Sequence, residues 1–159
     1  MNINNVRYIT TLFTVAGTLL LGAAGRAQNC VPVSGTISTN FIDQTTTVGT
    51  ATGDLAGGVS AVVQSVTPGP NGKITFSVVH RFVNAAGDHI ISEPSEAVAI
   101  PSAESGVLSL TFAGMELVGK TGSFEGATGS LKLFGGANLD RGEVVVRYRG
   151  QICYAAAKK

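Results

Sequence analysis

The chain is poor in chemically reactive side chains. Its 159 residues include no tryptophan, only two histidines and two cysteines, and 13% charged residues. Two histidines are too few for a multi-histidine metal site, and no serine lies in the GxSxG pattern of a hydrolase nucleophile. A multi-histidine metal site and a hydrolytic triad are therefore not expected. Without tryptophan, the core must be built from Val, Ile, Leu and a few Phe.

The first 27 residues have the three parts of a secretory signal peptide. Arg7 provides the positive start, an apolar run follows over residues 9–21, and Gly25 to Ala27 form a small-residue cleavage site. That run is shorter than the ~20 residues of a membrane-spanning helix, so an uncleaved anchor is only the alternative. We expect residues 28–159 to form one domain, secreted or periplasmic, with no membrane span after cleavage.

Removal of the signal peptide would leave a nearly neutral chain. The 11 Lys and Arg lose Arg7 and Arg26, which leaves nine against ten Asp and Glu and a formal charge of −1. Proteins that bind nucleic acid or anionic membranes present an excess of positive charge. Nucleic acid is therefore not an expected partner.

The two cysteines lie close to the ends of the mature chain. Cys30 is near its start and Cys153 near its end, and in an exported protein this placement favours a disulfide between them. Two unpaired buried thiols are the alternative. A metal site is not predicted, because neither cysteine has a second cysteine or a histidine at ligand spacing.

Most of the mature chain alternates between apolar and polar residues, as half-buried β-strands do. In residues 73–83, one face carries Ile74, Phe76, Val78, His80 and Phe82. Further strands are predicted around residues 33–39, 45–50, 54–66, 90–100, 107–118, 131–133 and 143–152. Pro94 indicates an edge position or a bulge in its strand, and Gly114 indicates a bulge.

Eight antiparallel strands with one apolar face predict an all-β protein, a closed eight-stranded barrel. The interior of such a barrel is either filled by side chains or holds one small ligand. Phe76, Phe82 and Phe112 point inward in this prediction and would contact an apolar ligand, or would fill the lumen with Phe124.

A glycine-dense corner, TGSFEGATG, spans residues 121–129. Glycine tolerates positive φ and close backbone contacts, so Gly126 and Gly129 indicate a tight turn. Phe124 at its centre is predicted to act as a structural plug that points into the barrel.

This corner, the segment GDLAG at residues 53–57 and the closing strand EVVVRYRGQI resemble the allene oxide cyclase and dirigent barrel superfamily, in its exported bacterial form. The likeness covers roughly residues 33–152. It implies an eight-stranded barrel, a homotrimer or dimer, and cofactor-free cyclisation or isomerisation in an apolar lumen, where the protein acts by constraining geometry. The catalytic residues of the plant enzymes have no match at positions of this sequence.

Residues 114–121, GMELVGKT, satisfy the P-loop pattern GxxxxGK[ST]. A phosphate-binding loop needs a helix after it, whose N-terminus faces the phosphate. Here the intervening residues are strand formers, and glycines that cannot sustain a helix follow Thr121. The match is therefore interpreted as fortuitous.

Few side chains remain as catalytic candidates. An inward-facing His80 could move a proton or polarise a carbonyl, and Tyr148, on the apolar face of the last strand, could donate a hydrogen bond to a ligand. For both, a core residue that is hydrogen-bonded within the protein is the favoured alternative. Glu93 and Glu96 could act as acid and base, but on an edge segment they would be solvated.

Two classes of function are consistent with these residues. The first is a barrel that binds a small apolar ligand and acts as a cofactor-free cyclase or isomerase, which requires an open lumen. The second is a non-catalytic structural or interaction module whose lumen is packed. Small residues such as Ala61 leave room in the lumen, whereas the phenylalanines could fill it.

Overall fold

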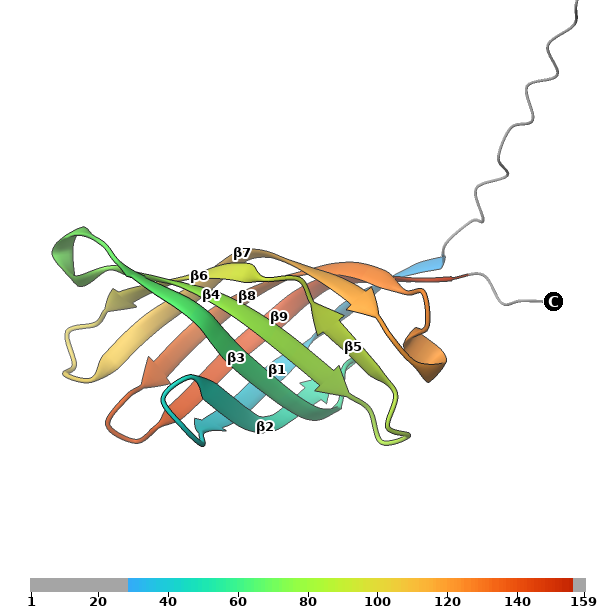
Figure 1. Cartoon of the computed structure of the whole chain (residues 1–159), viewed down its shortest axis with the longest axis horizontal. Helices are drawn as coiled ribbons and strands as arrows, with labels where there is room; N and C mark the ends of the chain where they lie inside the picture. The colour runs from blue at the N-terminus through green and yellow to red at the C-terminus, as the bar shows by residue number, and fades with distance from the viewer. Residues whose placement is uncertain (1–28, 156–159) are drawn as a thin grey trace, which may run out of the picture.

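The computed structural model describes residues 29–155, which form nine β-strands and two short 3-10 turns (Figure 1). The strands are β1 (Asn29–Phe41), β2 (Thr46–Gly53), β3 (Gly57–Pro68), β4 (Ile74–Val83), β5 (His89–Ser92), β6 (Ser95–Pro101), β7 (Val107–Gly119), β8 (Thr128–Asn138) and β9 (Glu143–Tyr154). The turns are η1 (Pro70–Gly72) and η2 (Gly122–Phe124). The expected signal peptide, residues 1–27, lies outside the described residues. Within residues 29–155, no helix is long and apolar enough to cross a membrane.

The strands form one closed antiparallel barrel. Neighbouring strands pair antiparallel around the sheet, and β1 pairs with β9 along twelve register positions to close the ring. β5 and β6 together occupy the single position between β4 and β7, since each pairs with both of these strands. The barrel therefore has eight strand positions, which confirms the predicted fold class.

The strand predicted over residues 90–100 is interrupted at Glu93 and Pro94, between β5 and β6. Proline has no N–H group to donate to a sheet. Two serines beside the break replace backbone bonds to β4 with side-chain bonds. The hydroxyl of Ser92 accepts a bond from the backbone N–H of His80 (2.8 Å), and the hydroxyl of Ser95 donates to the carbonyl of Val78 (3.2 Å). The edge position suggested by Pro94 is wrong, because a closed barrel has no edge here.

The predicted inward and outward faces are confirmed for β4 and β7. In β4, Val78, His80 and Phe82 are buried, whereas Arg81 is exposed. In β7, the register to β8 shifts between Phe112 and Met115, on either side of Gly114. The chain thus returns to the inward face at Met115, and the predicted bulge at Gly114 is confirmed.

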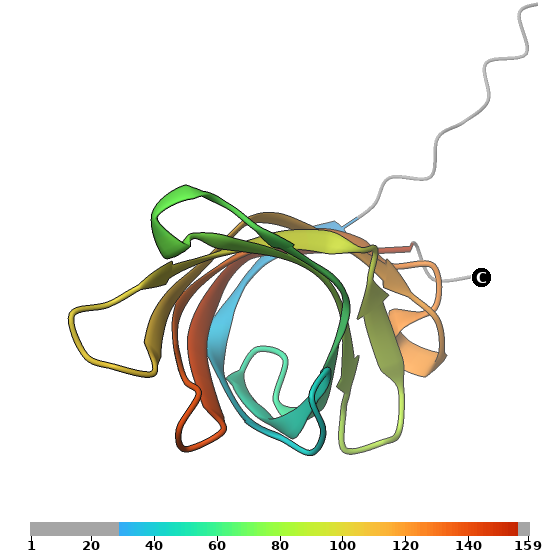
Figure 2. The same ribbon diagram turned by 60° about the vertical axis from the view of Figure 1, so that its left-hand side comes forward.

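The two ends of the barrel differ in what they contain. The turns β1–β2, β3–β4, β6–β7 and β8–β9 lie at one end, which we call the open end and which comes forward in Figure 2. The turns β2–β3, β4–β5 and β7–β8 lie at the other, the packed end, together with both termini of the described chain. The eight largest fully buried side chains fill the packed end and the middle of the barrel: Tyr148, Phe82, Ile90, Met115, Leu117, Leu131, Leu133 and Ile152.

The glycine-dense corner covers the packed end. Phe124 lies on η2, is 7% exposed, and stacks on Tyr154 with ring centroids 6.3 Å apart. Gly126 has a φ of +72°, in the left-handed region that favours glycine. Gly129 is extended, but a Cβ atom there would lie 2.6 Å from the carbonyl oxygen of Gln151. These contacts agree with a structural role for all three residues.

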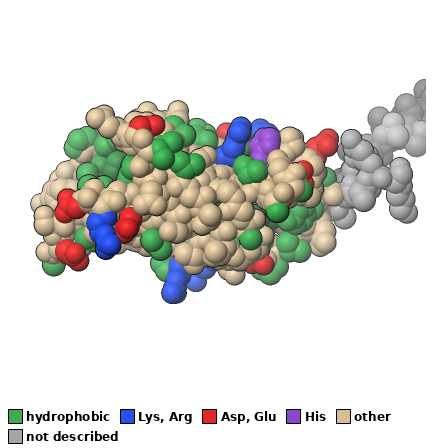
Figure 3. All heavy atoms as spheres, turned by 90° about the horizontal axis from the view of Figure 1, so that it is seen from below, with side chains coloured by type: hydrophobic (Ala, Val, Ile, Leu, Met, Phe, Trp, Pro, Cys, Tyr) green, Lys and Arg blue, Asp and Glu red, His purple; other side chains and the backbone are tan. Residues whose placement is uncertain are grey.

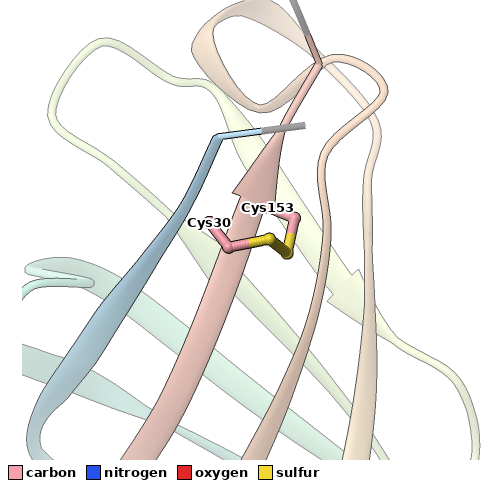
Figure 4. The surroundings of a disulfide bond; sticks show 2 residues. All are labelled: Cys30 and Cys153. Atoms are coloured by element: carbon pink, nitrogen blue, oxygen red, sulfur yellow. A yellow bond between two sulfur atoms is a disulfide. The ribbon is translucent and has the colours of Figure 1, made fainter. Parts of the chain in front are cut away.

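Cys30 and Cys153 form the predicted disulfide. The two residues face each other across β1 and β9, the strand pair that closes the barrel (Figure 4). The bond therefore joins residues 123 positions apart at the seam where the first and last strands meet.

Figure 3 shows the face of the barrel that points down in Figure 1, and charged side chains are sparse on this face. Uncharged polar groups and backbone dominate its centre, and charges of both signs lie around it (Figure 3). This face offers no extended surface of a single sign.

Candidate functional site

A cavity of about 730 Å³ occupies the half of the barrel toward the open end. Inward side chains of every strand except β5 surround it, and the β1–β2 and β8–β9 turns contribute to its entrance. None of the eight large side chains that fill the other half borders it. The lumen is thus hollow in one half and packed in the other, a combination that neither alternative from the sequence included.

Small side chains create this space. Ala61, Ala97 and Ala137 face the lumen on β3, β6 and β8 and border the cavity. Toward the packed end, the inward positions of β8 carry Leu131 and Leu133 instead. A methyl group fills much less of the lumen than a leucine side chain, so the interior remains empty where the alanines gather.

His80 lies at the inner end of the cavity, where β4 faces the break between β5 and β6. Its side chain borders the cavity although the residue is only 5% exposed. The imidazole contacts Phe112 edge to face, with centroids 5.3 Å apart, and lies nearly parallel to Phe82 at 6.3 Å. The bond from its backbone N–H to Ser92 fixes this part of β4.

The imidazole of His80 has an unused hydrogen-bonding atom. Its Nδ1 is buried and has no partner among residues 29–155. Burial disfavours the charged form and lowers the pKa of His80 to about 4. The ring is therefore neutral at pH 7, with one nitrogen that donates and one that accepts.

Tyr148 does not border the cavity. Its hydroxyl donates to the carbonyl of Thr52 (2.9 Å) and accepts from the N–H of Leu55 (2.8 Å). Desolvation raises the pKa of Tyr148. The ring of Phe82 lies between it and His80, with centroids 6.4 Å from Tyr148. This placement matches the structural alternative for Tyr148 and separates it from His80, the other catalytic candidate.

The three phenylalanines expected to contact a ligand are divided between the halves. Phe76 and Phe112 border the cavity, whereas Phe82 lies beyond His80 in the packed part. Phe82 therefore supports the inner end of the cavity from behind.

Polar residues that the sequence analysis did not select form one wall of the cavity. All come from β1, β2 and the turn between them: Thr39, Asp43, Gln44, Thr45 and Thr47. Thr39 and Thr47 are buried. The alternation of β1 places Thr39 two residues from the buried Ile37, so the inward position of Thr39 could have been found from the sequence.

Asp43 places a fixed negative charge at the entrance. One carboxylate oxygen accepts bonds from the N–H groups of Thr45 (2.8 Å) and Thr46 (2.7 Å) and from the hydroxyl of Thr45 (3.0 Å). These bonds, with the backbone bond from Thr45 the largest cause, lower the pKa of Asp43 below its usual value. The carboxylate is therefore ionised at neutral pH.

The remaining candidates lie outside the cavity. Glu93 and Glu96 are exposed on the outer surface, as are Arg147 and Arg149 on β9. The P-loop pattern begins in β7, and the segment after Lys120 forms the 3-10 turn η2 rather than an α-helix. It therefore lacks the helix N-terminus that a phosphate-binding loop requires.

Comparison with solved structures found a pterocarpan synthase dirigent protein. The alignment covers 96% of this chain and 100% of that chain, with 13% sequence identity and a TM-score of 0.34. Comparisons with protein-family models and with curated protein sequences gave no match.

Proposed function

We propose that this protein is an exported β-barrel that binds a small, mostly apolar ligand in the hollow half of its lumen. The observation that supports this most directly is the cavity itself, which is lined mainly by apolar side chains and has His80 at its inner end. Its volume of about 730 Å³ lies within the range of pockets that hold drug-sized ligands.

The side chains divide the binding task between contact area and orientation. Phe76 and Phe112 offer aromatic surface, and the aliphatic side chains of β3 and β9 add to it. The part of the His80 imidazole that borders the cavity can form a hydrogen bond with a ligand hydroxyl or carbonyl, so the ring can orient the ligand.

A cofactor-free isomerase or cyclase activity is the second candidate. The observation that favours it is a neutral imidazole in a site enclosed by apolar side chains, where a proton could be transferred to or from a bound ligand. With a pKa of about 4, His80 is a weak base at pH 7. Binding without turnover is therefore the better supported function. The alternative of a non-catalytic interaction module requires a packed lumen, and only the other half of the barrel is packed.

Export and self-association complete the proposal. The disulfide supports export, because such bonds persist in oxidising compartments. Exposed Phe134 and Val145, on the adjacent strands β8 and β9, offer an apolar outer surface for a homotrimer or dimer. Light scattering after size exclusion would determine the oligomeric state, and a monomer at micromolar concentration would contradict this part.

Titration with N-phenyl-1-naphthylamine, an uncharged fluorescent probe, tests ligand binding. We expect saturable binding by the wild type. Ala97→Leu extends a side chain into the cavity and should weaken binding at least tenfold. Val98→Leu, one residue along and on the outer face of β6, is the matched control and should bind like the wild type. Absence of saturable binding by the wild type would overturn the proposal.

His80→Phe separates binding from turnover. Phenylalanine keeps the bulk of the ring and removes both nitrogens, so an apolar probe should still bind. Any turnover of a substrate found later should be abolished in this variant. Turnover that persists in His80→Phe would exclude the catalytic role of His80.

A further inference from the structure

Charge is distributed unevenly around the cavity. Among the described residues that border it, none is a lysine or arginine, and Asp43 at the entrance is the single carboxylate. An anionic ligand group that entered the cavity would therefore lose its hydration without gaining a cationic partner. Burying an unpaired carboxylate is strongly unfavourable, and the charge of Asp43 adds repulsion at the entrance.

Uncharged hydrogen-bonding groups are available at the same wall. Thr39 and Thr47 face the lumen on neighbouring strands close to the open end and are 3% and 6% exposed. Each hydroxyl can donate one hydrogen bond and accept two. Apart from Asp43, Gln44, Thr45 and His80, the other side chains that border the cavity are aliphatic or aromatic. A hydroxyl or carbonyl at the outer end of a ligand would therefore meet partners on β1 and β2.

We infer that the cavity accepts uncharged ligands and rejects anions, and that the outer polar group of the ligand lies against Thr39 and Thr47. This inference rests on the proposed ligand-binding function and specifies the ligand class. The ligand is an apolar molecule with uncharged oxygen-containing groups, such as an alcohol or ketone. Carboxylates, sulfonates and phosphates of the same size are excluded.

Two matched pairs of probes test the rejection of anions. N-phenyl-1-naphthylamine and 8-anilino-1-naphthalenesulfonate share one aromatic framework and differ by a sulfonate. Decan-1-ol and decanoate, measured by displacement of the uncharged dye at pH 7.5, differ at one end of an alkyl chain. We expect the uncharged member of each pair to bind at least tenfold more tightly. Equal or tighter binding of the anions would overturn the inference while leaving ligand binding intact. If no probe binds, the proposed function itself fails.

Asp43→Asn tests the contribution of the entrance charge. Asparagine retains an oxygen that can accept the bonds from Thr45 and Thr46, so the turn should persist. We expect decanoate to bind about threefold more tightly to this variant at low salt, and decan-1-ol to bind as before. Asp140→Asn is the matched control, because Asp140 lies at the open end, is exposed and does not border the cavity. Equal changes in decanoate affinity in both variants would mean that the net charge of the protein causes the effect, and would contradict a role for Asp43.

Thr47→Val tests the position of the outer polar group. Valine keeps the shape of the side chain and removes the hydroxyl, so decan-1-ol should bind about three- to tenfold more weakly. The uncharged dye measures whether the cavity is otherwise intact. Thr50→Val, which changes an exposed residue on the same strand, should leave the affinity for decan-1-ol unchanged. An unchanged affinity in Thr47→Val as well would contradict the assigned position.

Discussion

His80 shows how a polar side chain is kept neutral in an apolar interior. The imidazole lies between two phenylalanine rings, and its Nδ1 has no partner within the described chain. The backbone N–H of the same residue donates a hydrogen bond to the hydroxyl of Ser92. The unpaired nitrogen therefore lowers the stability of the fold. The part of the ring that borders the cavity is the part available to a ligand.

Protonation of His80 should make stability depend on pH. Burial lowers its pKa from 6.5 in the unfolded chain to about 4 in the folded protein. Between these values only the unfolded chain binds the proton, so the free energy of unfolding should fall as the pH is lowered from about 6.5 to about 4. The difference corresponds to about 3 kcal/mol.

Urea unfolding of the wild type and His80→Phe across this pH range measures the effect. The carboxylates are common to both proteins, so the difference between the two curves isolates His80. Parallel curves would show that the imidazole is not desolvated in the folded protein.

Tyr148 is the residue for which position decides between a structural and a chemical role. Tyr148→Phe leaves the N–H of Leu55 and the carbonyl of Thr52 without their side-chain partner. We expect a loss of about 1 to 3 kcal/mol in the free energy of unfolding. Binding of N-phenyl-1-naphthylamine should be unchanged, because Tyr148 does not border the cavity. A variant of wild-type stability that no longer binds the probe would reverse this assignment.

At the scale of elements, the corner between β7 and β8 depends on one aromatic side chain. Phe124 is buried at the packed end against Tyr154. Truncation by Phe124→Ala should lower the free energy of unfolding by about 3 to 5 kcal/mol, as other buried phenylalanine truncations do. Urea unfolding measures this, and a loss under about 1 kcal/mol would place the ring outside the core.

Gly126→Val should also destabilise the protein, because a β-branched residue is strained at a φ of +72°.

The disulfide acts on the pair of strands that closes the barrel. Closing a loop of 123 residues restricts the unfolded chain, for which the chain-entropy estimate is about 4 to 5 kcal/mol, an upper bound. Reduction should therefore lower the melting temperature by several degrees, measured by calorimetry with and without reductant. Two alkylatable thiols in the unreduced protein would show that the bond does not form in solution.

At the scale of the whole molecule, the barrel combines a rigid packed half with a hollow half. Large side chains such as Met115 and Leu131 are fully buried in the packed part, whereas the strands around the cavity lack such contacts on their inner face. Regions with fewer buried apolar contacts open at a lower free energy. The hollow half is thus the part that can adapt to a ligand.

Hydrogen exchange should reveal this division. We expect amides of β1 and β2 near the open end, such as that of Thr47, to exchange faster than those of β8 around Leu131. Addition of N-phenyl-1-naphthylamine should slow exchange mainly in the hollow half. Uniform protection in both halves, unaffected by the probe, would contradict the division.

The alternation of side chains and the placement of glycines, which are local properties of the sequence, were sufficient to predict the barrel, the inward face of β4 and the bulge at Gly114. The disulfide was predicted from the position of the two cysteines near the ends of the mature chain. Pro94 predicted an edge position or a bulge. The strand is interrupted there, and the edge position is wrong because β5 and β6 each pair with both β4 and β7.

Whether the lumen is open could be decided only by the tertiary structure. Inward positions were predictable one strand at a time, but the free volume depends on which side chains meet across the barrel. Alanines of β3, β6 and β8 border the hollow half, whereas Leu117, Leu131 and Leu133 are fully buried in the other half. The same reason applies to the site: His80 and Tyr148 both face inward by sequence, yet the stagger of β4 and β9 around the ring puts one at the cavity and the other behind Phe82.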